Sequence, residues 1–88
     1  MQDKTSHWDS QKYSENSTMQ YAQSMAMIEQ YPFQGDEAIL DIGCGDGKIT
    51  YQIALRVPKG KVLGVDNSED MIHFAQKHFL PNLTYLFN

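Results

Sequence analysis

The stretch AILDIGCGDG, residues 38–47, decides the fold of this chain. Its first half is a short apolar run with one acidic residue near the end, and three glycines follow within the next five positions. A short apolar run bounded by turn residues is typical of a strand that is buried on both faces. Glycine has no Cβ and accepts positive φ, so Gly43 and Gly45 let the backbone turn sharply and approach a ligand closely. The stretch therefore predicts a buried strand that runs into a tight binding loop.

A second apolar run, KVLGVD at residues 61–66, also ends in an acidic residue. Between the two runs, residues 48–57 place Ile49, Ile53 and Val57 at spacings of four and are followed by Pro58, which predicts a short helix with a defined end. The pattern from residue 38 to residue 66 is therefore strand, helix, strand.

The remainder of the chain extends this alternation in both directions. Asn67-Ser68 provides a cap for a helix with acidic residues in its first turn and an apolar face as far as Phe79, and residues 83–87 read as a third strand. Upstream, Ser17-x-x-Gln20 has the form of a capping box, so we expect a helix over residues 18–30. The first sixteen residues are polar apart from Trp8 and Tyr13, which predicts an arm that docks elsewhere on the protein.

These elements predict an α/β fold with a Rossmann-like parallel sheet of three strands and helices on both faces, because helical crossovers join parallel strands in the right-handed sense. The expected organisation is an arm and helix at residues 1–32 and a β-α-β-α-β unit at residues 33–88. Residues 38–42 would then form an unpaired edge strand. An exposed apolar edge invites a partner, so we expect one of two things: these 88 residues are a truncated piece or a gene remnant, or the edge pairs with another copy in a homodimer or a strand-swapped oligomer.

Composition narrows the function classes. The chain has 88 residues and a formal charge of −4, so it forms one small domain or part of a larger one, and it lacks the basic excess typical of nucleic-acid binding. Its single cysteine, Cys44, excludes an internal disulfide and a zinc ribbon, and its histidines share no metal-ligand spacing. No apolar run is long enough for a membrane span, and we expect a cytoplasmic protein without a membrane or nucleic-acid partner.

The loop and the two acidic residues predict a site for a ligand that contains ribose. Ligands of parallel sheets bind beyond the carboxyl ends of the strands, where both the glycine loop and Asp66 fall. An acidic residue at the end of the second strand can accept hydrogen bonds from the ribose hydroxyls. ATP and GTP are excluded because Gly43 and Gly47-Lys48 are too close for a P-loop and Ile49 follows in place of Ser or Thr.

Two other ribose ligands remain, a dinucleotide and S-adenosylmethionine. The dinucleotide fingerprint requires a third glycine where this chain has Lys48, and Asp41 and Asp46 would repel a pyrophosphate. S-adenosylmethionine carries no phosphate, and its sulfonium and α-amino groups are cationic. The residues therefore favour S-adenosylmethionine over NAD.

Residues 39–47 resemble the first motif of class I S-adenosylmethionine-dependent methyltransferases, and residues 62–71, VLGVDNSEDM, resemble the second. The whole stretch resembles the small-molecule branch of this family that contains trans-aconitate and juvenile-hormone-acid methyltransferases, with weak matches at Trp8-Asp9 and Tyr13. The resemblance implies that Asp41 and the loop of Gly43, Cys44 and Gly45 hold the methionine moiety, that Asp66 binds the ribose hydroxyls, and that Asn67 and Met71 border the adenine.

The resemblance covers the cofactor-binding half of that family's domain. The family fold has seven strands in the order 3-2-1-4-5-7-6, and this sequence reaches the third. The resemblance implies an enzyme that methylates a small molecule, with acceptor-orienting residues outside these 88 residues; we expect the chain alone to be inactive, and no catalytic base is predicted. The alternatives are a non-catalytic S-adenosylmethionine or nucleoside-binding module, an association module, and a dinucleotide oxidoreductase.

Overall fold

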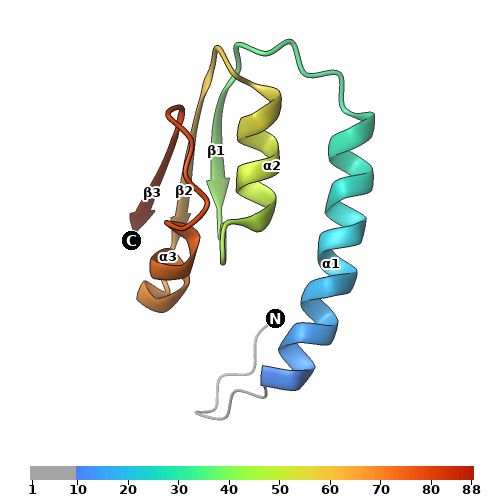
Figure 1. Cartoon of the computed structure of the whole chain (residues 1–88), viewed down its shortest axis with the longest axis vertical. Coiled ribbons are helices and arrows are strands. Elements are labelled where there is room, and N and C mark those ends of the chain that lie inside the picture. Colours follow the sequence, from blue (N-terminus) through green and yellow to red (C-terminus); the bar gives the residue numbers. More distant parts are fainter. Residues whose placement is uncertain (1–9) are drawn as a thin grey trace.

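The computed structural model of the protein describes the backbone from Ser10 to Asn88 and the side chains from Thr18 onward. Helices and strands alternate along this chain (Figure 1). In order, the elements are α1 (Ser10–Gln30), β1 (Ala38–Ile42), α2 (Lys48–Arg56), β2 (Lys61–Asp66), α3 (Glu69–Ala75) and β3 (Leu83–Phe87). The predicted α/β class is confirmed, and the bounds of the three strands are those expected from the apolar runs.

The strands form one parallel sheet in the order β1-β2-β3. Ile39 lies opposite Val62, and Val62 lies opposite Leu83, so every second residue of the three strands points to the same face. Only β2 is paired on both sides among the described strands. β1 is therefore an edge strand, as the sequence predicts for a three-stranded sheet.

The hydrophobic core lies on one face of this sheet. Val62 and Leu83 are buried there against Ala54 and Val57 of the α2 segment, with Ile39 packed at the margin. These four buried side chains remove apolar surface from water. Burial of this kind is the main stabilising contribution in so small a domain. The core thus fixes α2 directly above β2.

Helix α3 lies on the same face of the sheet as α2. Tyr85 of β3 packs against the core cluster, and its hydroxyl donates to the carbonyl oxygen of His78, three residues beyond α3, at 3.0 Å. The side chain of Tyr51 in α2 also meets the His78 ring. The expectation of helices on both faces is therefore wrong for the described residues, because successive right-handed crossovers that step in one direction place their helices on one side.

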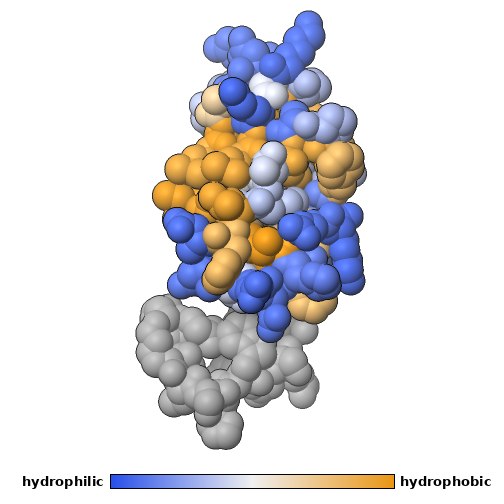
Figure 2. Space-filling view, turned by 90° about the vertical axis from the view of Figure 1, so that its left-hand side faces the viewer, coloured by the Kyte–Doolittle hydropathy of each residue, from blue (hydrophilic) through white to orange (hydrophobic). Residues whose placement is uncertain are grey.

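The opposite face of the sheet is apolar and open to solvent. It carries Leu40, Ile42 and Leu86, whose exposed fractions are 58, 77 and 50 %. A broad hydrophobic area is visible on the side of the molecule turned away from α1 (Figure 2). The prediction that residues 38–42 are buried on both faces is thus wrong for this chain, because no described element covers the second face.

Helix α1 is longer than the sequence predicts. It begins at Ser10 rather than at Thr18, since the segment before Thr18 contains neither Gly nor Pro and a helix extends readily once begun. Part of the predicted arm is therefore helical, whereas Trp8 and the Tyr13 side chain lie outside the described residues. α1 packs on α2 and buries Ile28 (Figure 1).

Helix α3 is shorter than its apolar pattern suggests. It ends at Ala75, and the N–H groups of Lys77 and His78 donate to carbonyls three residues earlier, which tightens the last turn. Phe79, expected on its apolar face, is 72 % exposed. In the described part of the chain, no helix is both long enough and apolar enough to cross a membrane.

Candidate functional site

The loop between β1 and α2 turns on glycines in the left-handed region of backbone space. Gly43, Gly45 and Gly47 have φ values of 77°, 59° and 82°. A side chain at Gly47 would also meet the Tyr85 hydroxyl at 2.8 Å and the Ala75 Cβ at 2.9 Å. Gly47 is therefore required both by its conformation and by its neighbours, whereas a Cβ at Gly45 would meet nothing within 4 Å.

The loop uses its own backbone donors inside the protein. Both Gly43 and Cys44 donate to the carbonyl of Val65, at 2.7 and 2.9 Å, and the N–H of Gly47 donates to the carbonyl of Cys44. The N–H groups of Gly45 and Lys48 donate to the carboxylates of Asp66 and Asp46. A phosphate-binding loop directs such groups at its ligand instead. This loop is consequently a poor cradle for a pyrophosphate.

Asp66 connects the ends of β2 and the loop. One carboxylate oxygen accepts from the N–H of Gly45 at 2.9 Å, and the other accepts from the N–H of Ser68 at 2.8 Å. These two bonds fix the orientation of the carboxylate, while each oxygen keeps further acceptor capacity. Asp66 can thus shape the loop and accept ligand hydroxyls at the same time.

Asp41 is held in place from α2. The hydroxyl of Thr50, which is fully buried, donates to one oxygen of Asp41 at 2.7 Å. A buried hydroxyl must find an acceptor, and a carboxylate is a strong one. Among the described residues, the second oxygen of Asp41 has no hydrogen-bond partner, and it lies near the end of β1 where the loop begins.

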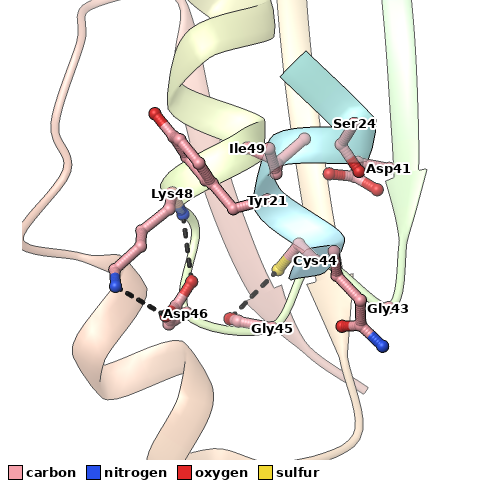
Figure 3. Close-up of a pocket in the computed structure, with 10 residues that line it drawn as sticks. Tyr21, Ser24, Asp41, Gly43, Cys44, Gly45, Asp46, Lys48 and Ile49 are labelled. Atoms are coloured by element: carbon pink, nitrogen blue, oxygen red, sulfur yellow. Dashed lines mark hydrogen bonds and ion pairs between the residues drawn. The ribbon is translucent and has the colours of Figure 1, made fainter. Parts of the chain in front are cut away.

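A cavity of about 260 Å³ opens beside the loop (Figure 3). Its walls come from α1, from the end of β1 with the loop, and from the first turn of α2. The lining residues are Gln20, Tyr21, Ser24, Asp41, Gly43, Cys44, Gly45, Asp46, Lys48 and Ile49. The cavity therefore contains two carboxylates and one ammonium group, together with neutral polar groups from α1.

The two charged residues at the mouth of the loop pair with each other. Lys48 Nζ lies 3.8 Å from an oxygen of Asp46, and the Asp46 carboxylate also accepts the Lys48 N–H at the start of α2. This arrangement leaves Asp41 as the acidic residue of the cavity that has no positive partner among the described residues. A cationic ligand group is the natural counter-charge for it.

Cys44 is not a nucleophile in this environment. Its side chain is buried, and burial together with the nearby carboxylates raises the pKa of its thiol to about 11. The thiol therefore remains protonated at neutral pH, whereas nucleophilic cysteines have a lowered pKa. Cys44 contributes surface to the cavity, and a Cβ added at Gly64 would meet the Cys44 Cβ at 3.0 Å and its sulfur at 3.1 Å, which leaves little room for a side chain there.

The structure brings most of the predicted site residues together. Asp41, Gly43, Cys44 and Gly45 line one cavity, and Asp66 is joined to it through Gly45. Asn67 is exposed after β2 and Met71 is half-buried in α3; neither lines the cavity. The roles of all seven residues in cofactor binding stay predictions.

The sequence did not indicate the part that α1 plays in the site. Gln20, Tyr21 and Ser24 line the cavity, although the helical spacing of Tyr21, Met25 and Ile28 indicated only packing. The sequence nevertheless contained a signal for this part of the site. The residues on this face of α1 change from apolar at Ile28 and Met25 to polar at Ser24 and Gln20, towards the start of the helix. No group of three potential metal-binding side chains occurs among the residues that the structure describes.

The chain is similar in sequence to known methyltransferases. Residues 33–83 match the family described as a methyltransferase domain. A protein of Invertebrate iridescent virus 6 named as methyltransferase 235L is 38 % identical over 78 residues, which cover 89 % of this chain and 29 % of that protein. Trans-aconitate 2-methyltransferase of Afipia carboxidovorans is 32 % identical over 79 residues, covering 90 % of this chain and 30 % of the enzyme.

A solved structure shares the fold. The plantazolicin methyltransferase BpumL, in complex with a pentazolic desmethylPZN analogue and SAH, superimposes with a TM-score of 0.64 at 25 % identity. The match covers 89 % of this chain and 34 % of BpumL. The chain thus spans about a third or less of the length of these relatives. It belongs to the class I S-adenosylmethionine-dependent methyltransferase family.

Proposed function

We propose that this chain is the cofactor-binding part of an S-adenosylmethionine-dependent methyltransferase that acts on a small molecule. The observation that carries the proposal is the glycine loop, in which the N–H groups of Gly43, Cys44, Gly45 and Gly47 are used within the protein while Asp41 faces the cavity. Such a loop suits a ligand that is cationic and free of phosphate at this end. Membership of the methyltransferase family supports the same choice of cofactor.

Each residue of the site has a role in this proposal. Asp41, oriented by Thr50, binds the ammonium group of the cofactor's amino acid end. Asp66, oriented by Gly45 and Ser68, accepts hydrogen bonds from the ribose hydroxyls. Asn67 and Met71 border the adenine.

When bound, S-adenosylmethionine supplies an electrophilic methyl group, whose bond to sulfur breaks as the acceptor's electron pair forms the new bond. The task of this chain is to hold the cofactor in one orientation, since the reacting atoms must be aligned at roughly 3–3.5 Å. None of the described residues is assigned a part in orienting the acceptor, so we expect no methyl transfer from the 88-residue chain alone.

A small acceptor is favoured over a nucleic acid. The chain carries a formal charge of −4, and the cavity exposes carboxylates rather than a basic surface. The similarity to trans-aconitate 2-methyltransferase supports the class of small acceptors without identifying one.

Calorimetric titration with S-adenosylmethionine tests the proposal, with NAD as the comparator. We expect a saturable heat with S-adenosylmethionine and none with NAD. Binding of NAD alone would favour the dinucleotide oxidoreductase. No heat with either ligand from the folded protein would contradict cofactor binding by this chain.

The open edge of β1 favours a second function, association with another copy of the chain. The unpaired edge exposes backbone donors and acceptors beside Leu40 and Ile42, which are among the more exposed apolar residues. Two β1 strands related by a twofold axis would pair in antiparallel fashion with Leu40 opposite Leu40, giving a continuous sheet across the dimer. Such a module could bind the cofactor without catalysing transfer.

Replacing Leu40 by lysine tests this association. We expect the mass in solution to fall from dimer to monomer, because a charge at the centre of an edge strand opposes pairing. Leu55→Lys is the matched control, since Leu55 is an exposed leucine (46 %) of α2 away from the edge. A monomeric parent protein across the concentration range, or a dimer that survives Leu40→Lys, would rule out the edge contact.

A further inference from the structure

The hydroxyl of Tyr85 lies where the glycine loop, β3 and the chain after α3 meet. It donates to the carbonyl oxygen of His78, three residues beyond α3, at 3.0 Å. The same oxygen lies beside the end of the loop, because a Cβ added at Gly47 would be 2.8 Å from it. Figure 1 shows α3 at the end of the sheet where β1 leads into the loop. One polar atom of β3 is therefore next to both the loop and the chain that follows α3.

The end of α3 approaches the loop at the same point. Ala75, the last residue of this helix, is fully buried, and its Cβ would be 2.9 Å from a Cβ added at Gly47. The carbonyl oxygen of Ala75 accepts the N–H of His78 at 2.8 Å, and the carbonyl oxygen of His78 accepts the Tyr85 hydroxyl. Gly47, Ala75, His78 and Tyr85 thus form one group, the Tyr85 cluster, which joins the loop to the end of α3.

The phenolic oxygen is the part of Tyr85 that the cluster depends on. Burial raises the pKa of Tyr85, and Cys44 and the nearby carboxylates raise it further. The hydroxyl is therefore protonated at neutral pH and acts as a donor. A phenylalanine ring would fill the same space against the core, but it could not donate to His78.

The two elements that the cluster joins serve different ends of the cofactor in the proposed function. Asp41 and the loop hold the amino acid end, whereas Asn67 and Met71 border the adenine from the side of α3. One ligand reaches both ends only when the loop and α3 are held at the matching separation, and a binding site has to be held to within about 0.5 Å. Tyr85 does not line the cavity beside the loop, so it can act on the ligand only through these two elements.

We infer that Tyr85 is a positioning residue of the cofactor site, whose bond to His78 sets the separation between the glycine loop and α3. The inference rests on the proposed function and adds to it a residue that does not touch the ligand. The expected effect is selective, because a ligand that uses only the side of α3 does not depend on this separation.

The test compares S-adenosylmethionine with adenosine in calorimetric titrations of Tyr85→Phe. Adenosine has the ribose and the adenine but lacks the amino acid end that the loop would hold. We expect the affinity for S-adenosylmethionine to fall about five- to tenfold, and the affinity for adenosine to change less than about twofold. The titrations are made under conditions in which urea unfolding shows both proteins to be folded. If Tyr85→Phe does not fold, Ala75→Gly, which removes a methyl group beside Gly47, is expected to show the same selectivity.

Tyr51→Phe is the matched control, because it removes a hydroxyl from a second tyrosine beside His78. The Tyr51 ring centroid is 5.7 Å from that of His78, but its hydroxyl makes no hydrogen bond to the residues that the structure describes. This variant should leave both affinities unchanged. Equal changes for the two ligands in Tyr85→Phe, or an unchanged affinity for S-adenosylmethionine, would overturn the inference and leave the proposed function standing. If the parent protein does not bind S-adenosylmethionine, the proposed function itself fails, and the inference with it.

Discussion

Replacing Asp66 by alanine is expected to weaken the binding of S-adenosylmethionine at least about a hundredfold. The variant loses two charge-assisted hydrogen bonds, from Gly45 at 2.9 Å and from Ser68 at 2.8 Å, that join the loop to the end of β2. Hydrogen bonds to charged groups are each worth about 1.5–3 kcal/mol, and the proposed ribose contacts are lost as well. Titration calorimetry of the variant and the parent protein measures the difference.

Glu69→Ala controls for the loss of one negative charge. Glu69 is exposed in the first turn of α3, near the same end of the sheet, and its carboxylate accepts no hydrogen bond from the part of the chain that the structure describes. We expect it to bind the cofactor as the parent does. Urea denaturation of both variants separates unfolding from loss of affinity. If Asp66→Ala folds and binds within about threefold of the parent, Asp66 has no part in the site.

Gly47→Ala is expected to destabilise the protein by about 2–5 kcal/mol, as measured by urea unfolding without ligand. Gly47 has a φ of 82°, and the left-handed conformation costs a residue with a Cβ about 1–2 kcal/mol. The added methyl would also lie 2.8 Å from the Tyr85 hydroxyl and 2.9 Å from the Ala75 Cβ, and overpacking costs roughly 1–3 kcal/mol.

Gly45→Ala is the matched variant for this prediction. It shares the left-handed backbone, with a φ of 59°, but an added Cβ would meet no atom within 4 Å. Its loss of stability should therefore stay near the conformational cost of about 1–2 kcal/mol. Equal losses at the two glycines would mean that contact with Tyr85 and Ala75 contributes nothing.

The strands were the part of the fold best predicted from sequence. The runs at residues 38–42, 61–66 and 83–87 are short, apolar and bounded by Gly, Pro or Asn, so each begins and ends where local chemistry changes. Helix ends were harder to predict. The capping box at Ser17 predicted that the helix begins at Thr18, but α1 begins at Ser10. A cap is worth about 1 kcal/mol, which does not prevent a helix from extending through a run of ordinary helix formers.

The exposure of the sheet could not be predicted from its sequence. The apolar run at residues 38–42 is what a central strand with both faces covered requires, and the sequence alone does not state what covers it. No described element covers the second face of this strand, so Leu40 and Ile42 are exposed. The loop and Asp66 were recognisable as a site because glycine and acidic residues have specific local uses, whereas Gln20 and Ser24 reach the cavity only through the packing of α1 on α2.

The hydrogen bonds inside the glycine loop have a consequence for how a ligand binds. Because Val65, Asp66 and Cys44 already accept the loop's N–H groups, the loop is ordered by the fold itself. The entropy lost in ordering it belongs to folding and does not have to be offset by each ligand that enters. The site is in this sense preorganised, and the affinity for the cofactor reflects contacts with a shape that exists beforehand.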